Sequence, residues 1–394
     1  MRNKSIIIIP LLLMLVFSCN KLIAQKELQD SIKEIRPGSL EFLYQKGYVF
    51  PTNDFVKGHN AENDIIDEFQ AFSVRITKQT IGKKLWEQQY NYPEYGLGIY
   101  VADFYNPQEI GVPIALYGYY TAPFYRWEKF LINYELGFGI AFNWKNYSQS
   151  NTFNTAIGAK YTVYLDLGIK AEYRFHKNFS VSAGFSLTHF SNGHLKDPNF
   201  GLNTIAPKIG IKYHLHKELP QFISREIPKY RSKNEFSFSV FGGMKNIIYD
   251  SMNIPESERF EGLSFFVGGF MGTVNRQISY KSKIGLGLSL SYDGSINAQV
   301  AVDEGELEVS KIQLLDHFQM SIFASYEWVV NKVSVLLQPG IYIYRKQIKN
   351  KSPVFYQRIG LKYNFYNNYY AGISLRAYYF SVSDFIEWSV GYSF

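Results

Sequence analysis

The chain has a single cysteine and, after its first residues, no long apolar run. Cys19 is the only cysteine in 394 residues, which excludes an internal disulfide framework, a zinc–thiolate site and a catalytic thiol beyond that position. No later stretch approaches the roughly 18 apolar residues of a helical membrane span. The formal net charge is +7, and the Lys and Arg residues are scattered along the chain. This distribution does not indicate a nucleic-acid-binding protein.

The first residues are typical of a secretion signal. A positively charged start precedes the apolar run Ile6–Phe17, which has the length of a signal-peptide core and is too short to span a bilayer as a helix. Cleavage after Ala24 would define a signal peptide over residues 1–24. A second interpretation is a lipobox at Val16–Cys19, in which Cys19 becomes an acylated N-terminus. The sequence leaves both open and favours the first, because a barrel needs no lipid anchor.

Aromatic residues and glycine are abundant, and they follow a two-residue period. The chain holds 32 Tyr, 32 Phe and 30 Gly. From Tyr161 to Phe175 every second residue is apolar, and the residues between are mostly polar. Ile386–Phe394 alternates in the same way and ends on Phe394. Such alternation predicts an all-β protein, an antiparallel transmembrane β-barrel of the bacterial outer membrane. The alternative is a soluble lipocalin-like barrel or sandwich, whose apolar face would point inward.

The alternation predicts about 16 strands in two similar halves. A first half over 25–215 and a second half over 235–394 are joined by 216–234, a polar, basic linker with two prolines. Seven strands are clear in the first half and an eighth is uncertain: 69–79, 96–105, 113–121, 129–144, 159–175, 179–191 and 203–215, with the eighth around 41–50. Eight are expected in the second half: 235–243, 263–273, 283–293, 315–328, 332–345, 354–365, 369–380 and 384–394.

A weak internal repeat is consistent with this division. Tyr173–Phe179 is echoed by Tyr363–Tyr369, each as the end of a strand and a tight turn. Any two barrel hairpins resemble one another, so duplication and coincidence both remain open. The sequence equally leaves open whether the halves form one large barrel or two tandem eight-stranded barrels.

The segment 179–191 places two polar side chains on its apolar face. Its odd positions are apolar up to Leu187 and then continue with His189 and Ser191, so by parity both point toward lipid. The long segment 192–202 that follows predicts an outward loop, because outer-membrane barrels have short periplasmic turns. An ionisable residue on a lipid face is costly and indicates a function, or else the level at which the strand leaves the hydrocarbon.

Two short motifs resemble a known family. His189–Gly193 reads His-Phe-Ser-Asn-Gly, and Pro198–Asn203 reads Pro-Asn-Phe-Gly-Leu-Asn. These residues resemble the signature of the PagL-type outer-membrane lipid A 3-O-deacylases, also called acyloxyacyl hydrolases. A looser likeness extends over about residues 150–215, including Asn154–Gly158.

The resemblance implies a serine esterase mechanism with roles for five residues. Ser191 would be the nucleophile and His189 its general base, with Asn192 and the Gly193 amide as oxyanion donors. The family's acid, which orients the histidine, falls at Asn203. An amide can accept the imidazole N–H but stabilises an imidazolium less well than a carboxylate. The catalytic prediction therefore depends most on Asn203.

Two functions remain open at this stage. The first is an outer-membrane esterase that removes an ester-linked acyl chain from lipid A, without metal or cofactor. The second is a non-catalytic barrel, a pore or structural protein, that retains a relic dyad. Its lumen residues would line a channel or close it by pairing: Asp166, Lys170, Glu172, Arg174, Lys208 and Lys212. The expected partner is lipid A of the outer leaflet, with no nucleic acid, and a homodimer is left open.

Overall fold

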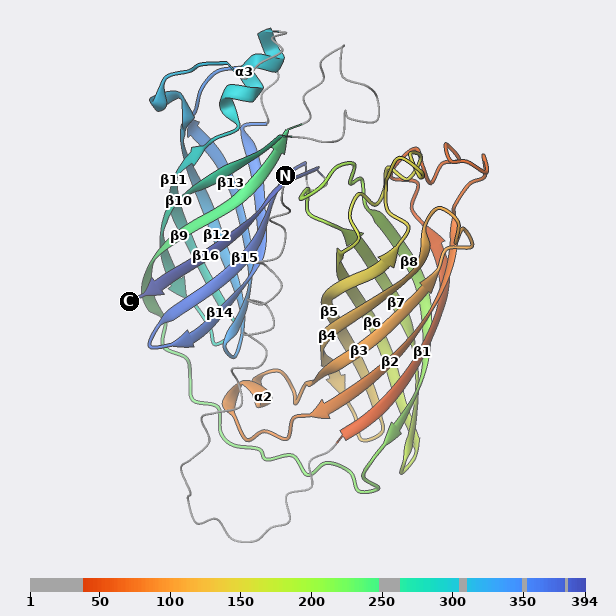
Figure 1. Cartoon of the computed structure of the whole chain (residues 1–394). Coiled ribbons are helices and arrows are strands. Elements are labelled where there is room, and N and C mark those ends of the chain that lie inside the picture. The colour runs from red at the N-terminus through yellow and green to blue at the C-terminus, as the bar shows by residue number, and fades with distance from the viewer. Residues whose placement is uncertain (1–37, 248–262, 305–309, 349–352, 380–381) are drawn as a thin grey trace. The chain divides into compact units, whose positions relative to one another are not determined.

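The alternating segments form two closed antiparallel β-barrels (Figure 1). The computed structural model describes residues 38–247, 263–304, 310–348, 353–379 and 382–394. The expected signal peptide and Cys19 lie outside the described residues.

The first barrel is a meander in which each strand pairs with its neighbour in sequence. β8 returns to pair with β1, with Ile209 opposite Tyr44, and this pairing closes the barrel. The strands are β1 (Gly38–Val49), β2 (Glu68–Gln79), β3 (Glu94–Asp103), β4 (Gly111–Arg126), β5 (Phe130–Trp144), β6 (Thr162–His176), β7 (Phe179–Ser191) and β8 (Leu202–His214).

The second barrel repeats this topology and closes by pairing of β16 with β9, with Val390 opposite Val240. Its strands are β9 (Lys233–Ile247), β10 (Leu263–Gln277), β11 (Ser282–Asp293), β12 (Phe318–Val330), β13 (Val333–Tyr344), β14 (Phe355–Tyr366), β15 (Tyr369–Tyr378) and β16 (Val382–Ser393). Among the described residues the helices are α2 (Leu85–Gln89), α3 (Ile296–Glu304) and the 3-10 helix η2 (Leu314–His317). Within the described ranges, no helix has the length and apolar character needed to cross a membrane.

The predicted all-β fold of about 16 strands in two halves is confirmed. The uncertain strand around 41–50 exists as β1, and its pairing with β8 decides the open question in favour of two barrels. β9 begins at Lys233, slightly inside the segment predicted as linker. Each half closes on itself and so has no unpaired strand edge left with which to join the other half in one larger barrel.

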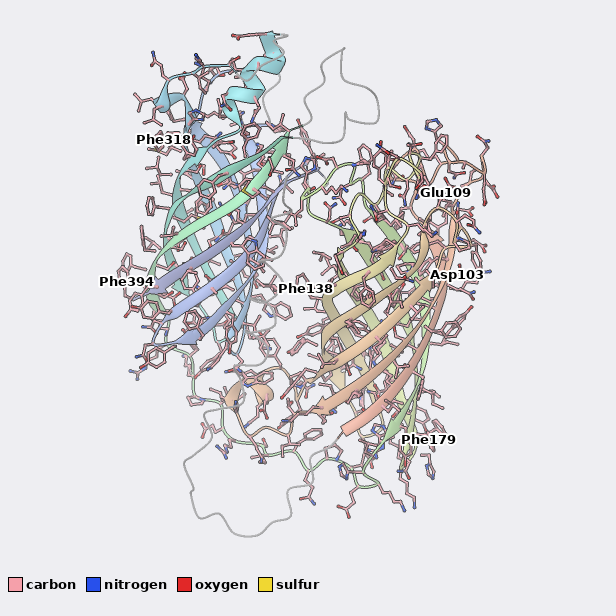
Figure 2. All side chains as sticks on the ribbon, in the orientation of Figure 1. Asp103, Glu109, Phe138, Phe179, Phe318 and Phe394 are labelled. Atoms are coloured by element: carbon pink, nitrogen blue, oxygen red, sulfur yellow. The ribbon has the colours of Figure 1, made fainter. Side chains whose placement is uncertain are left out.

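Each barrel is apolar outside and polar inside. On β6, Leu167 and Ile169 are 42% and 58% exposed, whereas Asp166 and Lys170 are 1% exposed. Figure 2 shows side chains projecting outward all along both walls, with Phe138 among those labelled. This is the reverse of a soluble barrel, so the lipocalin-like alternative is wrong, and it is typical of barrels that face lipid.

The lumen of the first barrel is filled by paired charges. Arg75 Nη1 lies 2.8 Å from Glu135 Oε1, and Lys170 Nζ lies 2.6 Å from Glu41 Oε1. Lys208 also contacts Glu135. Burying an ion costs several kcal/mol, and partners at hydrogen-bond distance offset this cost. Of the two possibilities for the lumen residues, the structure shows pairing for five of the six: Asp166, Lys170, Glu172, Lys208 and Lys212. The sixth, Arg174, instead donates to the backbone oxygens of Lys177 and His216.

The connections β1–β2, β3–β4, β5–β6 and β7–β8 all lie at one end of the first barrel, because antiparallel strands alternate in direction. These connections are packed together rather than extended into solvent. Phe55, Ile110 and Ile157 come from three of them, and each is at most 1% exposed. The loop end of the first barrel is therefore an ordered platform, and it carries the site.

Candidate active site

Ser191 and His189 lie at the loop end of β7. Alternate residues of a strand share a face, and both side chains follow Leu187, which is 47% exposed on the outer wall. The β7–β8 register places Asn203 directly opposite His189. Three polar side chains thus meet on the otherwise apolar outer face of β7 and β8, where His189 and Asn203 are half-buried and Ser191 is 8% exposed.

The three side chains form a continuous hydrogen-bonded chain. His189 Nε2 lies 2.9 Å from Ser191 Oγ, and His189 Nδ1 lies 2.6 Å from Asn203 Oδ1. Asn203 Oδ1 can only accept, so it binds the Nδ1 proton and leaves Nε2 as an acceptor for the Ser191 hydroxyl. This is the tautomer in which a histidine can act as a general base toward serine.

Asn203 is held at three points besides His189. Its side-chain Nδ2 donates to Thr52 Oγ1 at 3.3 Å, and its backbone carbonyl oxygen accepts from Phe50 N at 2.8 Å. Its backbone is also paired with β7. Thr52 follows β1 and is separated from Asn203 by 151 positions. No sequence signal singled it out, because the contact depends on barrel closure.

Asn192 makes hydrogen bonds within the loop 192–201. The Asn192 backbone N–H donates to Asn199 Oδ1 at 2.9 Å, and its side-chain amide donates to Lys196 O at 2.6 Å and accepts from Leu195 N. The backbone N–H and one of the two side-chain N–H groups are thus engaged within the loop. Asn192 has a structural role here, and its assignment as an oxyanion donor stays a prediction.

Asn199 offers a second candidate for the oxyanion donor. Its Oδ1 accepts from the backbone N–H of Asn192, and this contact fixes the side chain with Nδ2 on the side away from that N–H. Nδ2 is buried and has no hydrogen-bond partner in the described structure. A buried, unused donor beside the residue that follows Ser191 is suited to a ligand oxygen. Asn199 lies inside the Pro198–Asn203 motif, so the motif was the signal that could have found it.

Gly193 has a left-handed backbone, with φ of +63°. Within the described part of the chain, its amide N–H has no hydrogen-bond acceptor. It is therefore free to serve a ligand, and its role as an oxyanion donor stays a prediction. Glycine adopts this conformation without the steric penalty that a side chain would bring.

Close backbone contacts lock the loop onto the platform. Gly201 N donates to Ala156 O at 2.9 Å, and Asn53 Nδ2 donates to Gly201 O at 3.0 Å. A Cβ atom at Gly158 would lie 2.2 Å from Pro198 O, so this glycine is needed for the loops to approach. The segment Asn154–Gly158, which belongs to the looser family resemblance, is therefore the segment against which the loop 192–201 packs.

His194 and Asp197 do not take part in the chain of Ser191, His189 and Asn203. They pair with each other, His194 Nδ1 lying 3.1 Å from Asp197 Oδ1. Burial raises the pKa of the Asp197 carboxyl above its usual value, and the nearby His194 opposes this shift. Asp197 therefore cannot replace the acid absent at Asn203.

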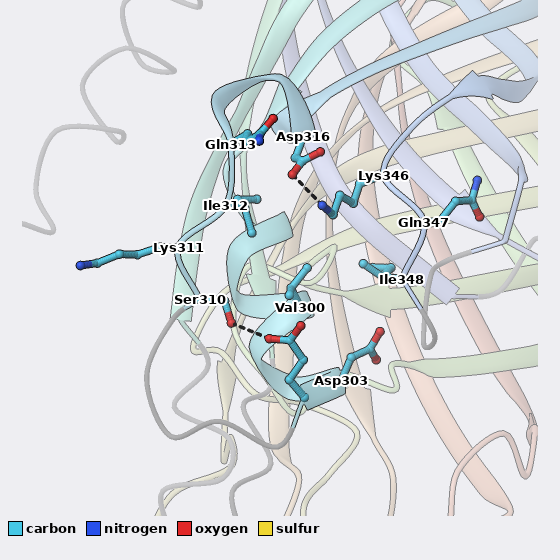
Figure 3. A pocket seen from close by; sticks show the side chains of 11 residues that line it. Val300, Asp303, Ser310, Lys311, Ile312, Gln313, Asp316, Lys346, Gln347 and Ile348 are labelled. Carbon is cyan, nitrogen blue, oxygen red and sulfur yellow. Dashed lines mark hydrogen bonds and ion pairs between the residues drawn. The ribbon is translucent and has the colours of Figure 1, made fainter.

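The second barrel carries no equivalent of this site in its described residues. Its one histidine, His317, stacks on Tyr292 and contacts the backbone oxygen of Asp293. Near its α3 end is a pocket of about 640 Å³ (Figure 3), in which Lys346 Nζ lies 2.6 Å from Asp316 Oδ2. The pocket lining includes Ser310 but no histidine that could activate it. No cluster of metal-binding side chains is present in the parts of the chain that the structure describes.

Family comparison agrees with the likeness seen in the motifs. Residues 70–212 match the family described as lipid A 3-O-deacylase (PagL), and residues 234–394 match the acyloxyacyl hydrolase C-terminal domain. The chain belongs to the PagL-type lipid A 3-O-deacylase family. The PagL match spans most of the first barrel, including the site, and the C-terminal domain match spans the second barrel. No curated protein matches the chain.

Solved structures match this PagL-type chain only at low identity and low TM-score. FpvA of P. aeruginosa has 13% identity and a TM-score of 0.22, with 91% of this chain and 54% of FpvA covered. An outer membrane channel from Pseudomonas putida F1 has 11% identity and a TM-score of 0.20, with 93% and 99% covered. A mutant porin of Rh. blastica has 8% identity and a TM-score of 0.16, with 91% and 99% covered. The chain thus spans about half the length of FpvA.

Proposed function

We propose that the protein is a serine esterase of the bacterial outer membrane that removes an ester-linked acyl chain from lipid A. The observation that carries this proposal is the Ser191–His189–Asn203 chain on an apolar outer wall. The family description points to the ester at the 3 position of lipid A. No metal or cofactor is required by these residues.

The position of the site fits a substrate dissolved in the membrane. Below His189 the wall continues with Leu187 and Ile205, which are paired across β7 and β8 and are 47% and 37% exposed. An acyl chain would lie along this wall, and its ester would reach the level of Ser191. Burial of apolar surface contributes about 25 cal/mol per Å². Contact of the acyl chain with this wall would therefore help to hold the ester at Ser191. The loop end would face outward, toward the leaflet that contains lipid A.

The reaction would proceed through an acyl-enzyme. His189 Nε2 takes the Ser191 hydroxyl proton while Oγ attacks the ester carbonyl carbon. Asn199 Nδ2 and the Gly193 amide donate to the oxygen that becomes negative. The bond between the ester carbonyl carbon and the sugar oxygen then breaks, and the proton on His189 passes to that oxygen. The acyl group is left on Ser191. Water, deprotonated by His189, releases the fatty acid and restores Ser191.

The test is mass spectrometry of lipid A from cells producing the wild type, Ser191→Ala or His189→Ala. Loss of one acyl chain is expected with the wild type alone, and identical acylation in all three strains would refute the enzyme. Ser180→Ala is a matched control, because Ser180 Oγ also contacts a histidine, His214 Nε2, at 2.7 Å, but is 1% exposed inside the same barrel. This variant should deacylate as the wild type does.

The alternative of a pore is disfavoured by the paired charges in the lumen. Arg75 and Lys170 contact acidic partners across the first barrel, and Arg358 contacts Glu387 in the second. We expect no stepwise ion conductance from the purified protein in planar bilayers. Stable conductance steps would favour the pore.

A further inference from the structure

The backbone of Gly201 passes directly beside the candidate catalytic pair. A Cβ atom built on Gly201 would lie 3.2 Å from His189 Cε1 and 3.5 Å from Ser191 Cβ. Gly201 also stands two residues after Asn199 and two residues before Asn203. A shift of this one backbone position would therefore disturb the imidazole, the nucleophile and both asparagines that are proposed to assist them.

Two neighbouring connections hold the peptide groups of Gly201. Its N–H donates to Ala156 O at 2.9 Å, in the β5–β6 connection. Its carbonyl oxygen accepts from Asn53 Nδ2 at 3.0 Å, in the β1–β2 connection. Asn53 is 5% exposed and is separated from Gly201 by 148 positions. The Asn53 side chain therefore fastens the carbonyl side of Gly201 to the platform.

The orientation of the Asn53 amide is fixed by its two neighbours. Its Oδ1 accepts from Val56 N at 3.2 Å, while its Nδ2 donates to Gly201 O. A backbone N–H can only donate and a backbone carbonyl can only accept. A reversed amide would place its NH₂ group against the Val56 N–H and its oxygen against the Gly201 carbonyl, and both contacts would be repulsive. Both ends of this side chain are thus assigned by groups whose hydrogen-bonding roles cannot change.

Loss of the Asn53 amide would leave the carbonyl of Gly201, a buried residue, without this donor. An unpaired buried polar group is unfavourable, so the loop would move until the oxygen reached another donor. A misplacement of about 1 Å at a reacting centre can cost roughly a hundredfold in rate. The apolar wall of Leu187 and Ile205, on which the acyl chain would lie, does not include Gly201. The movement should therefore slow the chemical step and leave substrate binding intact.

We propose that Asn53 is a positioning residue that holds Gly201 against His189 and Ser191 and so fixes the geometry of the general base and the nucleophile. This proposal rests on the proposed esterase function. It gives the β1–β2 connection a part in the reaction, although neither sequence motif includes that segment. The contact depends on barrel closure, which pairs β1 with β8.

The experiment measures fatty acid release from purified lipopolysaccharide by the full-length protein in detergent micelles. Asn53→Leu keeps the approximate size of the side chain and removes both of its hydrogen bonds. It should lower kcat about tenfold and keep KM within about twofold of the wild type, because an effect on the geometry of the reaction alone lowers kcat and kcat/KM equally. An unchanged kcat would overturn the positioning role, whether or not KM rises.

Asn60→Leu is the matched control in the same connection. Asn60 is 2% exposed, its Nδ2 donates to Phe55 O at 3.0 Å and to Asp64 O at 2.6 Å, and its Oδ1 accepts from Asp64 N at 3.2 Å. The substitution thus removes three hydrogen bonds, all of them within the connection. It should keep kcat within about twofold of the wild type. A loss equal to that of Asn53→Leu would mean general support of the connection and would overturn the proposal.

Hydrogen exchange of the Gly201 N–H, measured by NMR, gives a readout that needs no turnover. This N–H donates to Ala156 O in the wild type. We expect its exchange to be at least about tenfold faster in Asn53→Leu and unchanged in Asn60→Leu. Equal exchange in the wild type and Asn53→Leu would overturn the positioning role even if activity falls.

Substrate binding separates positioning from a general loss of structure. In the Ser191→Ala background, Asn53→Leu should bind lipopolysaccharide within about twofold of Ser191→Ala alone, and a loss of binding would overturn the positioning role. If the wild type releases no more fatty acid than Ser191→Ala does, the proposed function itself fails. Release that depends on Ser191 but not on Asn53 overturns only the positioning role.

Discussion

His189 Nδ1 lies 2.6 Å from Asn203 Oδ1, across the register of β7 and β8. Strand pairing places the two residues opposite each other, so the backbone itself aims the amide oxygen at the imidazole. The contact gives His189 the tautomer that can accept from Ser191. An asparagine at the position of the acid can therefore hold the histidine in the tautomer that a serine–histidine–acid triad requires.

Asn199→Ala should lower kcat by about 10²- to 10³-fold with KM nearly unchanged, the usual cost of removing one oxyanion donor. Asn199→Asp separates the two roles of this side chain. Its carboxylate can still accept from Asn192 N, as Oδ1 does at 2.9 Å, but it has no N–H to donate. Steady-state kinetics on lipopolysaccharide should show both variants impaired. Full activity in Asn199→Asp would assign Asn199 to loop structure alone.

Gly201→Ala should lower kcat at least about tenfold, because small displacements of catalytic groups are costly. Gly201 has φ of +72°, and its new Cβ would lie 2.9 Å from Phe190 O and 3.2 Å from His189 Cε1. The added methyl group must therefore move the strand end or the imidazole. Gly272→Ala is the control, since a Cβ there meets nothing within 4 Å. Equal kinetics for the two variants would contradict the tight packing around His189.

Glu387→Gln should reduce the free energy of unfolding by about 3–5 kcal/mol, because it leaves two buried cations without a charged partner. Arg358 Nε and Arg376 Nε each donate to Glu387 at 2.7 Å inside the second barrel. Glu68→Gln breaks an exposed pair with Lys46 at 3.1 Å and should cost less than about 1 kcal/mol. Urea titrations in lipid vesicles would compare them, and equal midpoints would mean that the lumen charges contribute no net stability.

The loop 192–201 should lose stability as pH rises through the titration of Asp197. Burial raises the pKa of this carboxyl, so the folded loop binds the proton more tightly than the unfolded chain does. Its stabilising contribution is complete below the unfolded pKa and disappears as pH rises through the folded value. Hydrogen exchange of the loop, compared between the wild type and Asp197→Asn, measures this. The advantage of Asp197→Asn should grow with pH, and a constant difference would contradict the shift.

The sequence by itself determined the strands and the side of the sheet on which the candidate active-site residues lie. Side-chain direction in a strand has a period of two, so the placement of His189 and Ser191 beside Leu187 follows from counting residues. The same rule separates Asp166 and Lys170 from Leu167 and Ile169 on β6. Local geometry is sufficient for such conclusions, and they did not depend on how the strands close.

The tertiary structure decided everything that depends on contacts between distant segments. One barrel and two barrels have the same alternation, and only the pairing of β8 with β1 distinguishes them. That closure also brings Thr52 to Asn203 across 151 positions. Asn199 and Asn192 are both polar loop residues in the sequence, and only the folded loop shows that Asn192 Nδ2 donates to Lys196 O while Asn199 Nδ2 is buried without a partner. Hydrogen-bond partners are set by approach in space, which the order of residues does not encode locally.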